Sequence, residues 1–572
     1  MCGIFGIINK LDLIGDMSFA ELMKHRGPDA FGSWKNENVL FEHKRLSIID
    51  LSTAANQPFI KIPGYVLVYN GEIFNFMELR NQLKLEFNFA THSDTEVLYY
   101  FLVKYRVKEL NKLNGMFAFA FYDFKKQKVY LVRDRYGIKP LYYYKGKDFL
   151  IFSSEQKSIY AALKNVQINQ QYLPEYLAYK YIAGKNTLVK DVYELEPGRF
   201  IEYDIESNTM KECKWYEMSE MRQADTDNLV DTVENCLKDS VVRRLISDVP
   251  VGLQLSGGID SSIIAKIVAD TNPGRLRSYS IGFPESIFDE SAYAFKIASL
   301  LGVEHTAIDF TLEDFLNIWE LATYHNDEPI NHPHSLPIFK LTRVAAKDVT
   351  VLLSGEGADE VFLGYEHYKT TLADNISAQD LVRYYRFNSD DSVIRMLDHG
   401  LSLNGDMEDY RFRLLGSKLE GKITYDLNTH LNTLLNRIDK MSMANSMEIR
   451  IPFLDYRLVS LGFREKKENL LSDQFRKKPL MDLYERYFKD GLSSRRKVGF
   501  RVPFDEWLSS SQKLRDFMGD YIAILRNDGR LQRAYIEQLL TKLHVGLLDN
   551  ENIKEAWTLV NYSIWKKQFH FS

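Results

Sequence analysis

The residue with the clearest capacity for covalent chemistry is Cys2, which follows Met1 and precedes Gly3 and Ile4. Removal of Met1 would leave a thiol and a free α-amino group on the same residue. The thiol has an ordinary pKa of about 8.5 and the α-amino group titrates near ~8, so the amine can take the thiol proton at neutral pH. A nucleophile and its base would then come from one residue. A buried structural cysteine is the alternative interpretation when Cys2 is taken alone.

Four short polar clusters follow within the first 100 residues. Each one has an ordinary interpretation as a surface turn, an ion pair or a helix cap. Gly71 follows a strand-like run and allows a turn with an exposed amide, and Ser93 or Asp94 is a typical helix N-cap. The clusters are His25-Arg26-Gly27-Pro28-Asp29, Arg45-Leu46-Ser47-Ile48-Ile49-Asp50, Asn70-Gly71-Glu72 and Ser93-Asp94-Thr95-Glu96.

A second centre of chemistry is the segment Ser256-Gly257-Gly258-Ile259-Asp260-Ser261-Ser262. It lies between an apolar, strand-like run at 251–255 and a helical run at 263–269. A strand, a glycine-rich turn and a helix aim backbone N–H groups and a helix N-terminus at an anion, and the serine hydroxyls add donors. The Gly-Lys-Ser/Thr ending of a Walker A loop is absent. An ordinary turn in a doubly wound sheet is the alternative.

Acidic residues follow another apolar run, at 349–353, in Ser354-Gly355-Glu356-Gly357-Ala358-Asp359-Glu360. Because parallel strands end at one edge of a sheet, this segment and residues 256–262 can lie together there. Carboxylates beside a phosphate site suit Mg²⁺, although acids also stabilise a helix N-terminus. The basic run at 494–497 is either a solvated face or the source of a phosphate-binding lysine, Lys497.

The elements that must position these residues differ between the two halves of the chain. Short strands alternate with turns up to about residue 200, which indicates two packed sheets with helices outside. From residue 229 strands and helices alternate, which indicates a mostly parallel, doubly wound sheet, and residues 370–572 are helix-rich. The predicted strands are 5–9, 39–41, 65–69, 117–123, 128–133, 149–153, 251–255, 276–283, 306–310 and 349–353, and the predicted helices are 77–85, 95–105, 229–246, 263–269, 289–301 and 332–346.

Composition narrows the class of protein. A chain of 572 residues is too long for one core, so two to four domains are expected. We expect domains at 1–206 and 228–572, joined by the polar segment 207–227. With a net charge of -5 and no block of one sign, neither nucleic acid nor an anionic membrane is an expected partner. Three cysteines do not make a disulfide framework, which favours a cytoplasmic protein. No apolar run has the ~20 residues of a membrane span, and no signal peptide is expected.

Residues 2–200 resemble the class II glutamine amidotransferase domain, an N-terminal nucleophile hydrolase. The resemblance rests on Cys2-Gly3-Ile4, the four polar clusters, the run at 134–141 and Ser153-Ser154-Glu155-Gln156-Lys157. It implies an αββα sandwich in which Cys2 attacks the glutamine side-chain amide, releases ammonia and leaves a γ-glutamyl thioester for hydrolysis. It also implies a glutamine site formed by Arg45, Leu46, Ser47, Ile48, Ile49, Asn70, Gly71, Glu72 and Asp94.

The same resemblance implies a role for the polar members of that site. Arg45 would bind the α-carboxylate of glutamine, for which a planar guanidinium is suited. Glu72 and Asp94 would bind the α-ammonium group. Asn70 and the Gly71 amide would form the oxyanion hole, where loss of one donor typically lowers the rate about 100- to 1,000-fold.

Residues from about 230 to at least 510 resemble the asparagine-synthetase family of ATP pyrophosphatases. The motifs are residues 256–262, Asp327-Glu328-Pro329, residues 354–360 and residues 495–500. With the N-terminal half, they look like a glutamine-hydrolysing asparagine synthetase. The resemblance implies that aspartate attacks the α-phosphate of ATP, which gives β-aspartyl-AMP and pyrophosphate, and that ammonia from an internal tunnel displaces AMP. Homodimers are common in the family.

This second resemblance also assigns residues. Glu356 would serve the intermediate and the attack by ammonia, Asp260 and Asp359 would position Mg²⁺, and Lys497 would stabilise charge on the phosphates. The implied ATP and pyrophosphate site consists of Leu255, Ser256, Gly257, Gly258, Asp260, Ser261, Ser262, Ile281, Ser354 and Gly355.

The sequence leaves two candidates for the carboxylate acceptor. Ile259 stands where the family usually has Leu, which is conservative, but Leu363 stands where it usually has Gly, beside the acceptor side. The acceptor is therefore either aspartate or another carboxylate, on a sugar uronic acid or a specialised metabolite.

Two other classes of protein are less favoured. A binding or regulatory protein without turnover would not require Cys2, Asn70, Asp260, Glu356 and Lys497 together. A self-processing hydrolase needs a propeptide, and none is expected before Cys2.

Overall fold

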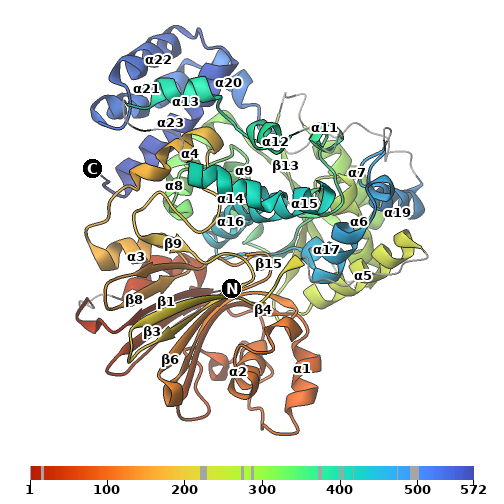
Figure 1. Ribbon diagram of the computed structural model, residues 1–572. Helices are drawn as coiled ribbons and strands as arrows, with labels where there is room; N and C mark the ends of the chain where they lie inside the picture. The colour runs from red at the N-terminus through yellow and green to blue at the C-terminus, as the bar shows by residue number, and fades with distance from the viewer. Residues whose placement is uncertain are drawn as a thin grey trace.

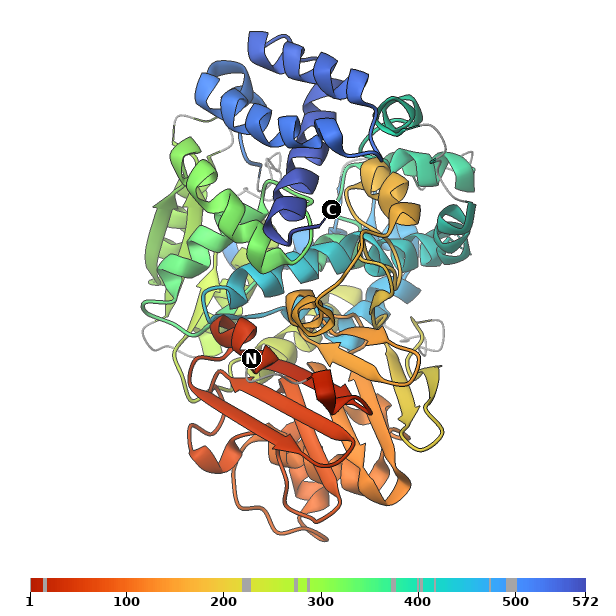
Figure 2. The same cartoon turned by 90° about the vertical axis from the view of Figure 1, so that its left-hand side faces the viewer.

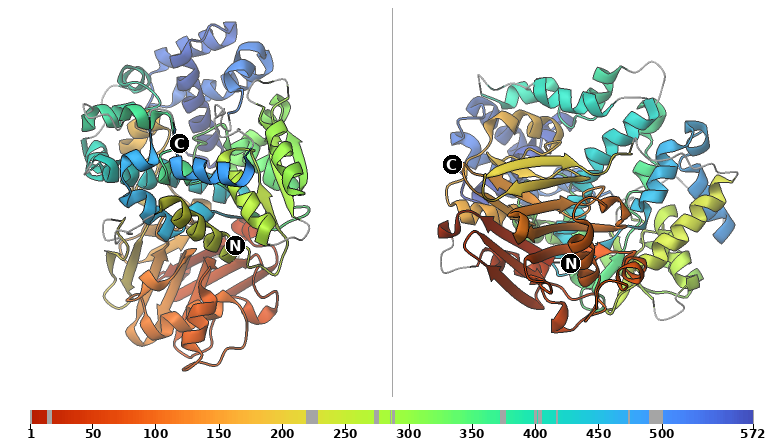
Figure 3. Two further views of the ribbon diagram at one scale, coloured as in Figure 1. Left: turned by 90° about the vertical axis from the view of Figure 1, so that its right-hand side faces the viewer. Right: turned by 60° about the horizontal axis from the view of Figure 1, so that its bottom comes forward.

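The structure is a computed structural model, and its N-terminal strands form one layered unit beneath the rest of the chain (Figure 1). The left panel of Figure 3 shows the same division from another side, with the sandwich at the bottom and the blue C-terminal helices at the top. The structure describes residues 2–13, 18–218, 228–271, 276–284, 286, 289–371, 377–398, 401, 405–415, 418–472, 475–489 and 501–571.

Two antiparallel sheets pack face to face in the N-terminal half, which confirms the predicted αββα sandwich. Buried apolar side chains such as Ile4, Val68 and Leu131 fill the space between the sheets. Helices α1 (Phe76–Leu83) and α2 (Asp94–Tyr105) pack on one side, and α3 (Gln156–Leu163) lies on the other. One sheet has the order β2 (Ala30–Lys35), β3 (Val39–Arg45), β1 (Cys2–Ile8), β8 (Leu150–Ser153), β7 (Tyr142–Lys145), β9 (Val192–Glu194), and the other β11 (Thr209–Lys214), β10 (Arg199–Asp204), β6 (Lys128–Arg133), β5 (Gly115–Asp123), β4 (Tyr65–Ile73).

Local sequence explains several of these elements. Ser93 caps α2 as predicted, since its side chain accepts a hydrogen bond from the Glu96 amide at 3.3 Å. β4 and β5 are buried on both faces, which is why their sequences read as nearly continuous apolar runs rather than alternating ones.

The structure corrects one predicted turn and places part of the predicted linker in a strand. Asn70, Gly71 and Glu72 continue β4 instead of turning, because all three pair with β5. Thr209–Lys214, which fall within the predicted linker 207–227, form β11 and pair with β10. β11 is polar and half-exposed, as is typical of an edge strand. Composition alone does not distinguish such a strand from a polar linker.

The C-terminal half contains a five-stranded sheet, predicted to be mostly parallel, in which all strand pairs are parallel. The chain builds outward from β12 in one direction to β13 and β14, and then returns to the other side of β12 to add β15 and β16. The order therefore reverses between β12 and β15, and ligands bind at such a switch point in doubly wound sheets. The strands run in the order β14 (Glu304–Asp309), β13 (Arg277–Gly282), β12 (Val251–Gln254), β15 (Val351–Leu353), β16 (Glu448–Arg450).

Helices surround this sheet and form most of the chain after it. None of the helices in the described part of the chain is both long and apolar enough to cross a membrane. The helices are α5 (Leu229–Arg244), α6 (Ile259–Thr271), α7 (Ser291–Leu301), α8 (Leu312–Asn326), α9 (Ser335–Ala345), α10 (Ala358–Val361), α11 (His367–Thr371), α12 (Ala378–Tyr384), α13 (Asp390–Met396), α14 (Gly405–Leu414), α15 (Lys418–Asn428), α16 (His430–Met443), α17 (Tyr456–Arg464), α18 (Lys467–Leu470), α19 (Lys478–Phe488), α20 (Phe504–Ser510), α21 (Gln512–Ile524), α22 (Arg533–Val545) and α23 (Asn550–Gln568).

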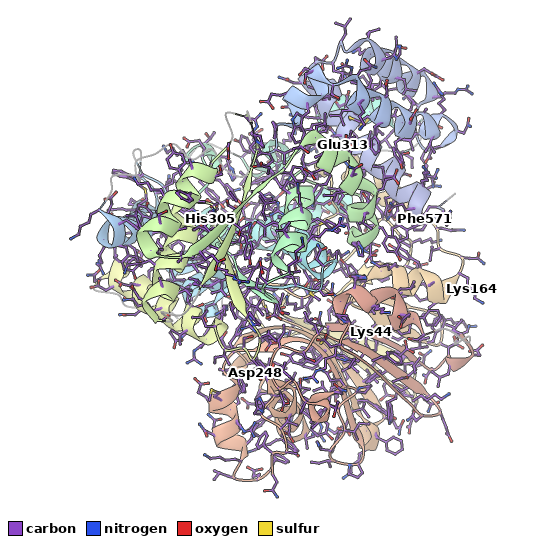
Figure 4. All side chains as sticks on the ribbon, turned by 180° about the vertical axis from the view of Figure 1, so that it is seen from behind. Lys44, Lys164, Asp248, His305, Glu313 and Phe571 are labelled. Carbon is purple, nitrogen blue, oxygen red and sulfur yellow. The ribbon has the colours of Figure 1, made fainter. Side chains whose placement is uncertain are left out.

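The two halves interlock. Helix α4 (Leu173–Tyr179) leaves the sandwich and lies among the C-terminal helices (Figures 1 and 2). There the Tyr176 hydroxyl donates to the Thr558 carbonyl at 2.9 Å, and the Phe387 amide donates to the Ala178 carbonyl at 2.8 Å. At the opposite edge, Asp248 (labelled in Figure 4) accepts a hydrogen bond from the Asp50 amide at 2.7 Å.

Candidate active sites

Strand β1 places Cys2 at the end of the six-stranded sheet, directly opposite Arg45 of β3. Cys2 is buried, and its backbone nitrogen donates to Asn70 Oδ1 at 2.9 Å. Asn70 lies on β4 of the facing sheet. The two sheets of the sandwich therefore bring the predicted nucleophile and a predicted oxyanion-hole residue into contact.

Asn70 and Gly71 have the features of donors that await a ligand. The Asn70 side-chain oxygen is used by Cys2, while its buried Nδ2 has no hydrogen-bond partner in the described part of the chain. A buried, unpaired donor is costly unless a ligand accepts from it. Gly71 has a φ of +149°, and a Cβ there would lie 2.1 Å from the Met116 carbonyl oxygen. Only glycine fits this position.

Arg45 is a buried cation held by neutral groups. Its guanidinium donates to the Ser52 carbonyl and to Asn56 Oδ1, both at 2.8 Å, and to the Asp50 carbonyl. Among the described residues no carboxylate forms a salt bridge with Arg45. The guanidinium is thus fixed in place with its charge uncompensated, which suits the predicted contact with a ligand carboxylate.

Residues 46–49 form the loop that follows Arg45 rather than a strand. Leu46 and Ile48 are buried, and the Ser47 amide donates to Asp29 Oδ2 at 2.7 Å. The Ile48 carbonyl accepts from the Asp248 amide at 2.8 Å. With Ile49, these residues lie where the resemblance predicts one wall of the glutamine site.

Glu72 and Asp94 are buried carboxylates whose charges repel each other. Burial first, and then the charge of Asp94, raises the pKa of Glu72 well above its usual range. Burial also raises the pKa of Asp94, whose Oδ2 accepts from the Tyr69 hydroxyl at 2.9 Å and the Ile73 amide at 3.0 Å. Glu72 Oε2 has no hydrogen-bond partner among the described residues. Such a pair favours a cation between its members, as the predicted ammonium contact requires.

The glycine-rich segment in the C-terminal half forms a tight loop between β12 and α6. Ser261 Oγ lies 3.1 Å from Ser256 Oγ, and it also accepts from the Ser256 amide at 3.2 Å. The Gly257 φ is +72°, and a Cβ there would lie 2.6 Å from the Ala294 nitrogen. Helix α6 begins at Ile259, so its first amides face the loop. Ser262 Oγ is buried without a hydrogen-bond partner in the described chain.

The second glycine-rich segment lies against the first. A Cβ on Gly355 would be 3.1 Å from both Asp260 Cβ and the Ser261 nitrogen. Ser354 follows β15, the neighbour of β12, and its amide donates to the Arg450 carbonyl at 2.9 Å. Leu255, Gly258 and Ile281 complete this edge, at the ends of β12 and β13. The residues predicted for ATP and pyrophosphate thus gather at the switch point of the sheet.

The two aspartates predicted for Mg²⁺ meet across a lysine that the sequence did not reveal. Lys477 Nζ lies 2.7 Å from Asp260 Oδ2 and 2.8 Å from Asp359 Oδ1. Asp260 Oδ1 is buried and accepts no hydrogen bond from the described residues. No cluster of three metal-binding side chains occurs in the described ranges. Two carboxylates still fit Mg²⁺, which usually takes one or two of them with substrate phosphates and water.

Glu356, three residues before Asp359 in the same segment, contacts Arg437 of α16 at 3.2 Å. Lys497 falls outside the described residues. Glu360, the last acid of the motif, is buried and accepts a hydrogen bond from the Tyr365 hydroxyl at 2.6 Å. Burial, followed by the charges of Asp359 and Glu356, raises the pKa of Glu360 to about 8.

Buried charges link Cys2 to helix α16 of the C-terminal half. Arg26 Nε donates to the Cys2 carbonyl at 3.0 Å, and the same guanidinium pairs with Glu155 at 3.1 Å and with Asp439 of α16 at 2.8 Å. Asp439 and Arg437, which pairs with Glu356, are two residues apart on α16. Sequence reasoning assigned no role to these arginines. The available signal was a run of charged residues, Arg437, Asp439 and Lys440, inside an amphipathic helix.

Arg450 links the halves a second time. It lies 3.8 Å from Glu72 Oε1 in the predicted glutamine site and 2.5 Å from Glu448 Oε1 on its own strand. Its backbone carbonyl holds the Ser354 amide of the other site. A residue of β16 thus touches the predicted machinery of both halves.

Comparison with known proteins finds a matching family for each half of the chain. Residues 1–216 match the glutamine amidotransferase domain, and residues 232–567 match asparagine synthase. The chain is 31% identical to glutamine-hydrolysing asparagine synthetase 1 of Bacillus subtilis, over 99% of this chain and 96% of that protein. It is 28% identical to glutamine-hydrolysing asparagine synthetase B of Escherichia coli, over 87% of this chain and 82% of that protein. It is also 32% identical to the amidase chry2 of Gibberella zeae, over 63% of this chain and 56% of that protein. The chain therefore belongs to the family of glutamine-hydrolysing asparagine synthetases, carbon–nitrogen ligases whose amido donor is glutamine.

Proposed function

We propose that this enzyme converts aspartate to asparagine, with ATP as the source of energy and glutamine as the source of nitrogen. The observation that carries the proposal is the similarity over 99% of the chain to a protein named asparagine synthetase, combined with the assembly of both predicted sites. Homodimer formation and a cytoplasmic location belong to the same proposal.

The first reaction takes place at Cys2. The thiolate attacks the side-chain amide of glutamine, while Arg45 binds the α-carboxylate and Glu72 and Asp94 bind the α-ammonium group. Asn70 Nδ2, buried and without a hydrogen-bond partner among the described residues, and the Gly71 amide stabilise the oxyanion. Collapse of the tetrahedral intermediate expels ammonia, and water then hydrolyses the thioester to glutamate.

The second reaction takes place at the switch point of the parallel sheet. Residues 256–262 bind the departing pyrophosphate with backbone amides and hydroxyl groups, and Ser354 and Gly355 line the nucleotide. The acceptor carboxylate attacks the α-phosphate of ATP to form an acyl-adenylate. Glu356 assists the attack of ammonia, which displaces AMP. Asp260 and Asp359 would hold Mg²⁺, which neutralises charge on the phosphates when bound.

A second acceptor class is supported by Leu363. This residue is fully buried and has a φ of +58°, a conformation that favours glycine. A side chain therefore occupies a place beside the acceptor region where the family usually has none. The same chemistry on a uronic acid or another metabolite carboxylate is the alternative to aspartate.

The deciding experiment measures pyrophosphate release with ATP, Mg²⁺ and ammonia. Aspartate is compared with a panel of uronic acids and other carboxylic acids. Release with aspartate alone, with asparagine as product, supports the leading proposal. Release only with another acid keeps the mechanism and replaces the acceptor. Absence of release with every acid contradicts the ligase mechanism.

A further inference from the structure

Basic side chains gather next to Glu356, at the junction of the two halves. The basic cluster consists of Lys180, His332, His334, His430 and Arg437. Lys180 Nζ lies 3.4 Å from His332 Nδ1, and the His332 ring centroid is 6.0 Å from that of His334 and 5.9 Å from that of His430. Arg437 connects the cluster to Glu356 at 3.2 Å.

Three separate segments contribute to the basic cluster. Lys180 directly follows α4, a helix of the N-terminal half that lies among the C-terminal helices, as the gold ribbon in Figures 1 and 2 shows. His332 and His334 precede α9, and His430 and Arg437 are on α16. Residues so far apart in sequence meet only because the two halves interlock.

Burial lowers the pKa of His332, His334 and His430, so these rings are neutral at neutral pH and the positive charge of the cluster comes from Lys180 and Arg437. In the described ranges no carboxylate lies within ion-pair distance of Lys180, His332 or His430. Lys180 Nζ instead lies 3.7 Å from the centroid of the Phe387 ring. Burial lowers the pKa of Lys180 to about 7, and burial followed by the charges of Arg437 and Lys180 lowers the pKa of His334 to about 3. An anion that enters the cluster would favour the protonated form of Lys180 and bind beside it.

A small cavity lies within reach of the cluster. Its volume is about 50 Å³, and Lys180 and Arg437 both line it. This is more space than one water molecule needs. The side chains of Asn326, Asn432 and Asn436 supply further polar groups. Two acids also line it: Glu194 is paired with Arg133 at 2.8 Å, and burial raises the pKa of Glu328.

We infer that the basic cluster binds a second anionic group of the acceptor, separate from the carboxylate that is amidated. This inference rests on the proposed function, because it concerns the acceptor of that same reaction. The acceptor is then either an amino dicarboxylic acid such as aspartate, or a uronic acid that carries a phosphate. Lys180 determines this specificity, so the glutamine-hydrolysing half contributes a residue to acceptor recognition.

The first test uses Lys180→Met, which keeps the length of the side chain and removes its charge. Ammonia serves as the nitrogen donor. The KM for the acceptor should rise about tenfold or more, since a buried charge pair is lost, while kcat, the KM for ATP and glutaminase activity change little. Lys185→Met, a nearby exposed lysine, is the matched control. An unchanged acceptor KM in Lys180→Met would overturn the inference.

A comparison of different acceptor substrates distinguishes the two possible sources of the second anionic group. Aspartate represents the second carboxylate, and galacturonic acid 1-phosphate and a nucleoside-diphosphate galacturonic acid represent the phosphate. Free galacturonic acid, which lacks a second anionic group, should be a poor acceptor. Equal kcat/KM for galacturonic acid and its phosphorylated forms would contradict the inference.

A binding test separates this inference from the proposed function. Thermal unfolding is followed at neutral pH with succinate or inorganic phosphate added. Without an anion, Lys180→Met should unfold at a higher temperature than the wild type, because a buried charge without an acidic partner is removed. The anions should raise the Tm of the wild type more than that of Lys180→Met. Equal shifts would refute the anion site, even if no acid in the panel releases pyrophosphate and the proposed function fails.

Discussion

Arg26 of the N-terminal half and Asp439 of the C-terminal half form a 2.8 Å salt bridge in which both side chains are buried. Arg26 also pairs with Glu155 and donates to the carbonyl of Cys2. The strand that carries the proposed nucleophile and the helix that contacts Glu356 therefore share one cation. This contact belongs to a larger buried network in which Lys157 pairs with Asp327 at 2.7 Å.

Replacement of that cation should destabilise the protein. Arg26→Met leaves two buried carboxylates without their shared partner, and we expect a loss of about 3–5 kcal/mol in the free energy of unfolding. Thermal or urea unfolding measures it. Arg199→Met removes a partly exposed cation that pairs with Glu196 and Glu212, and should cost no more than about 1 kcal/mol. Equal losses in the two variants would show that Arg26 is no more than an ordinary ion pair.

Removal of the Cys2 thiol should separate the two reactions. Cys2→Ala is expected to abolish glutamine hydrolysis and glutamine-dependent product, because no nucleophile remains, and to retain product formation from ammonia. Glutamate and pyrophosphate are measured in parallel. Cys213→Ala, a substitution on the edge strand β11, should behave as the wild type. Glutaminase activity in Cys2→Ala would remove this residue from the mechanism.

Loss of the Glu356 carboxylate should have the opposite effect. Glu356→Gln keeps the size of the side chain, so ammonia- and ATP-dependent product should fall at least about 100-fold while glutamine hydrolysis continues. Product is quantified with saturating ammonia. Glu366→Gln, at an exposed position of the following segment, is the control. A variant with wild-type synthesis would show that Glu356 takes no part in the chemistry.

Glu360 should make stability depend on pH. Its pKa is raised to about 8 by burial and then by the charges of Asp359 and Glu356, so the folded chain keeps a proton that the unfolded chain loses near pH ~4.5. Its contribution to stability is present at low pH and is lost as the pH rises toward about 8. Glu360→Gln cannot lose that proton.

The comparison of Tm values checks this sign. Wild type and Glu360→Gln should unfold at similar temperatures near pH ~5, and the variant should become the more stable of the two above pH ~8. Glu468→Gln, an exposed substitution, should follow the wild type throughout. A difference in Tm that stays constant across this range would show that Glu360 is ionised at neutral pH.

Because of the backbone conformation at Leu363, a glycine variant should be more stable than an alanine variant, which is the reverse of the usual order. Both Leu363→Ala and Leu363→Gly lose a fully buried side chain, but only glycine accepts the φ of +58° without strain. Leu363→Gly should therefore be about 1 kcal/mol more stable than Leu363→Ala. Urea unfolding measures both. At Leu461, inside helix α17, the alanine variant should be the more stable. The same order at both positions would contradict strain at Leu363.

Much of the fold follows from local patterns. The apolar run before the first glycine-rich segment is β12, the run after it is part of α6, and residues 128–133 form β6 with the expected ends. The turn predicted at Gly71 is wrong, because the strand pairing of Gly71 with Phe117 on β5 outweighs the local preference of glycine for a turn. Helix α8 was missed, although Thr311 and Asp314 form a capping box at its start.

The residues of the candidate sites also differ in whether they could be predicted from the sequence. Motif residues such as Asn70 and Asp260 could be selected because their neighbours in sequence are distinctive. Lys477, Arg450 and Lys180 could not, because each acquires its significance from partners more than 100 residues away. Single charged residues of this kind carry no local signature.

The path of α4 bears on how such enzymes diversify. A chimera that combines the first 216 residues of one relative with the remainder of another would exchange more than the glutamine amidotransferase domain's own site. It would also exchange Lys180 and the Tyr176 contact with Thr558. Natural recombination between relatives is therefore expected to succeed where the two parents share an acceptor, and to fail or create new substrate preferences where they do not.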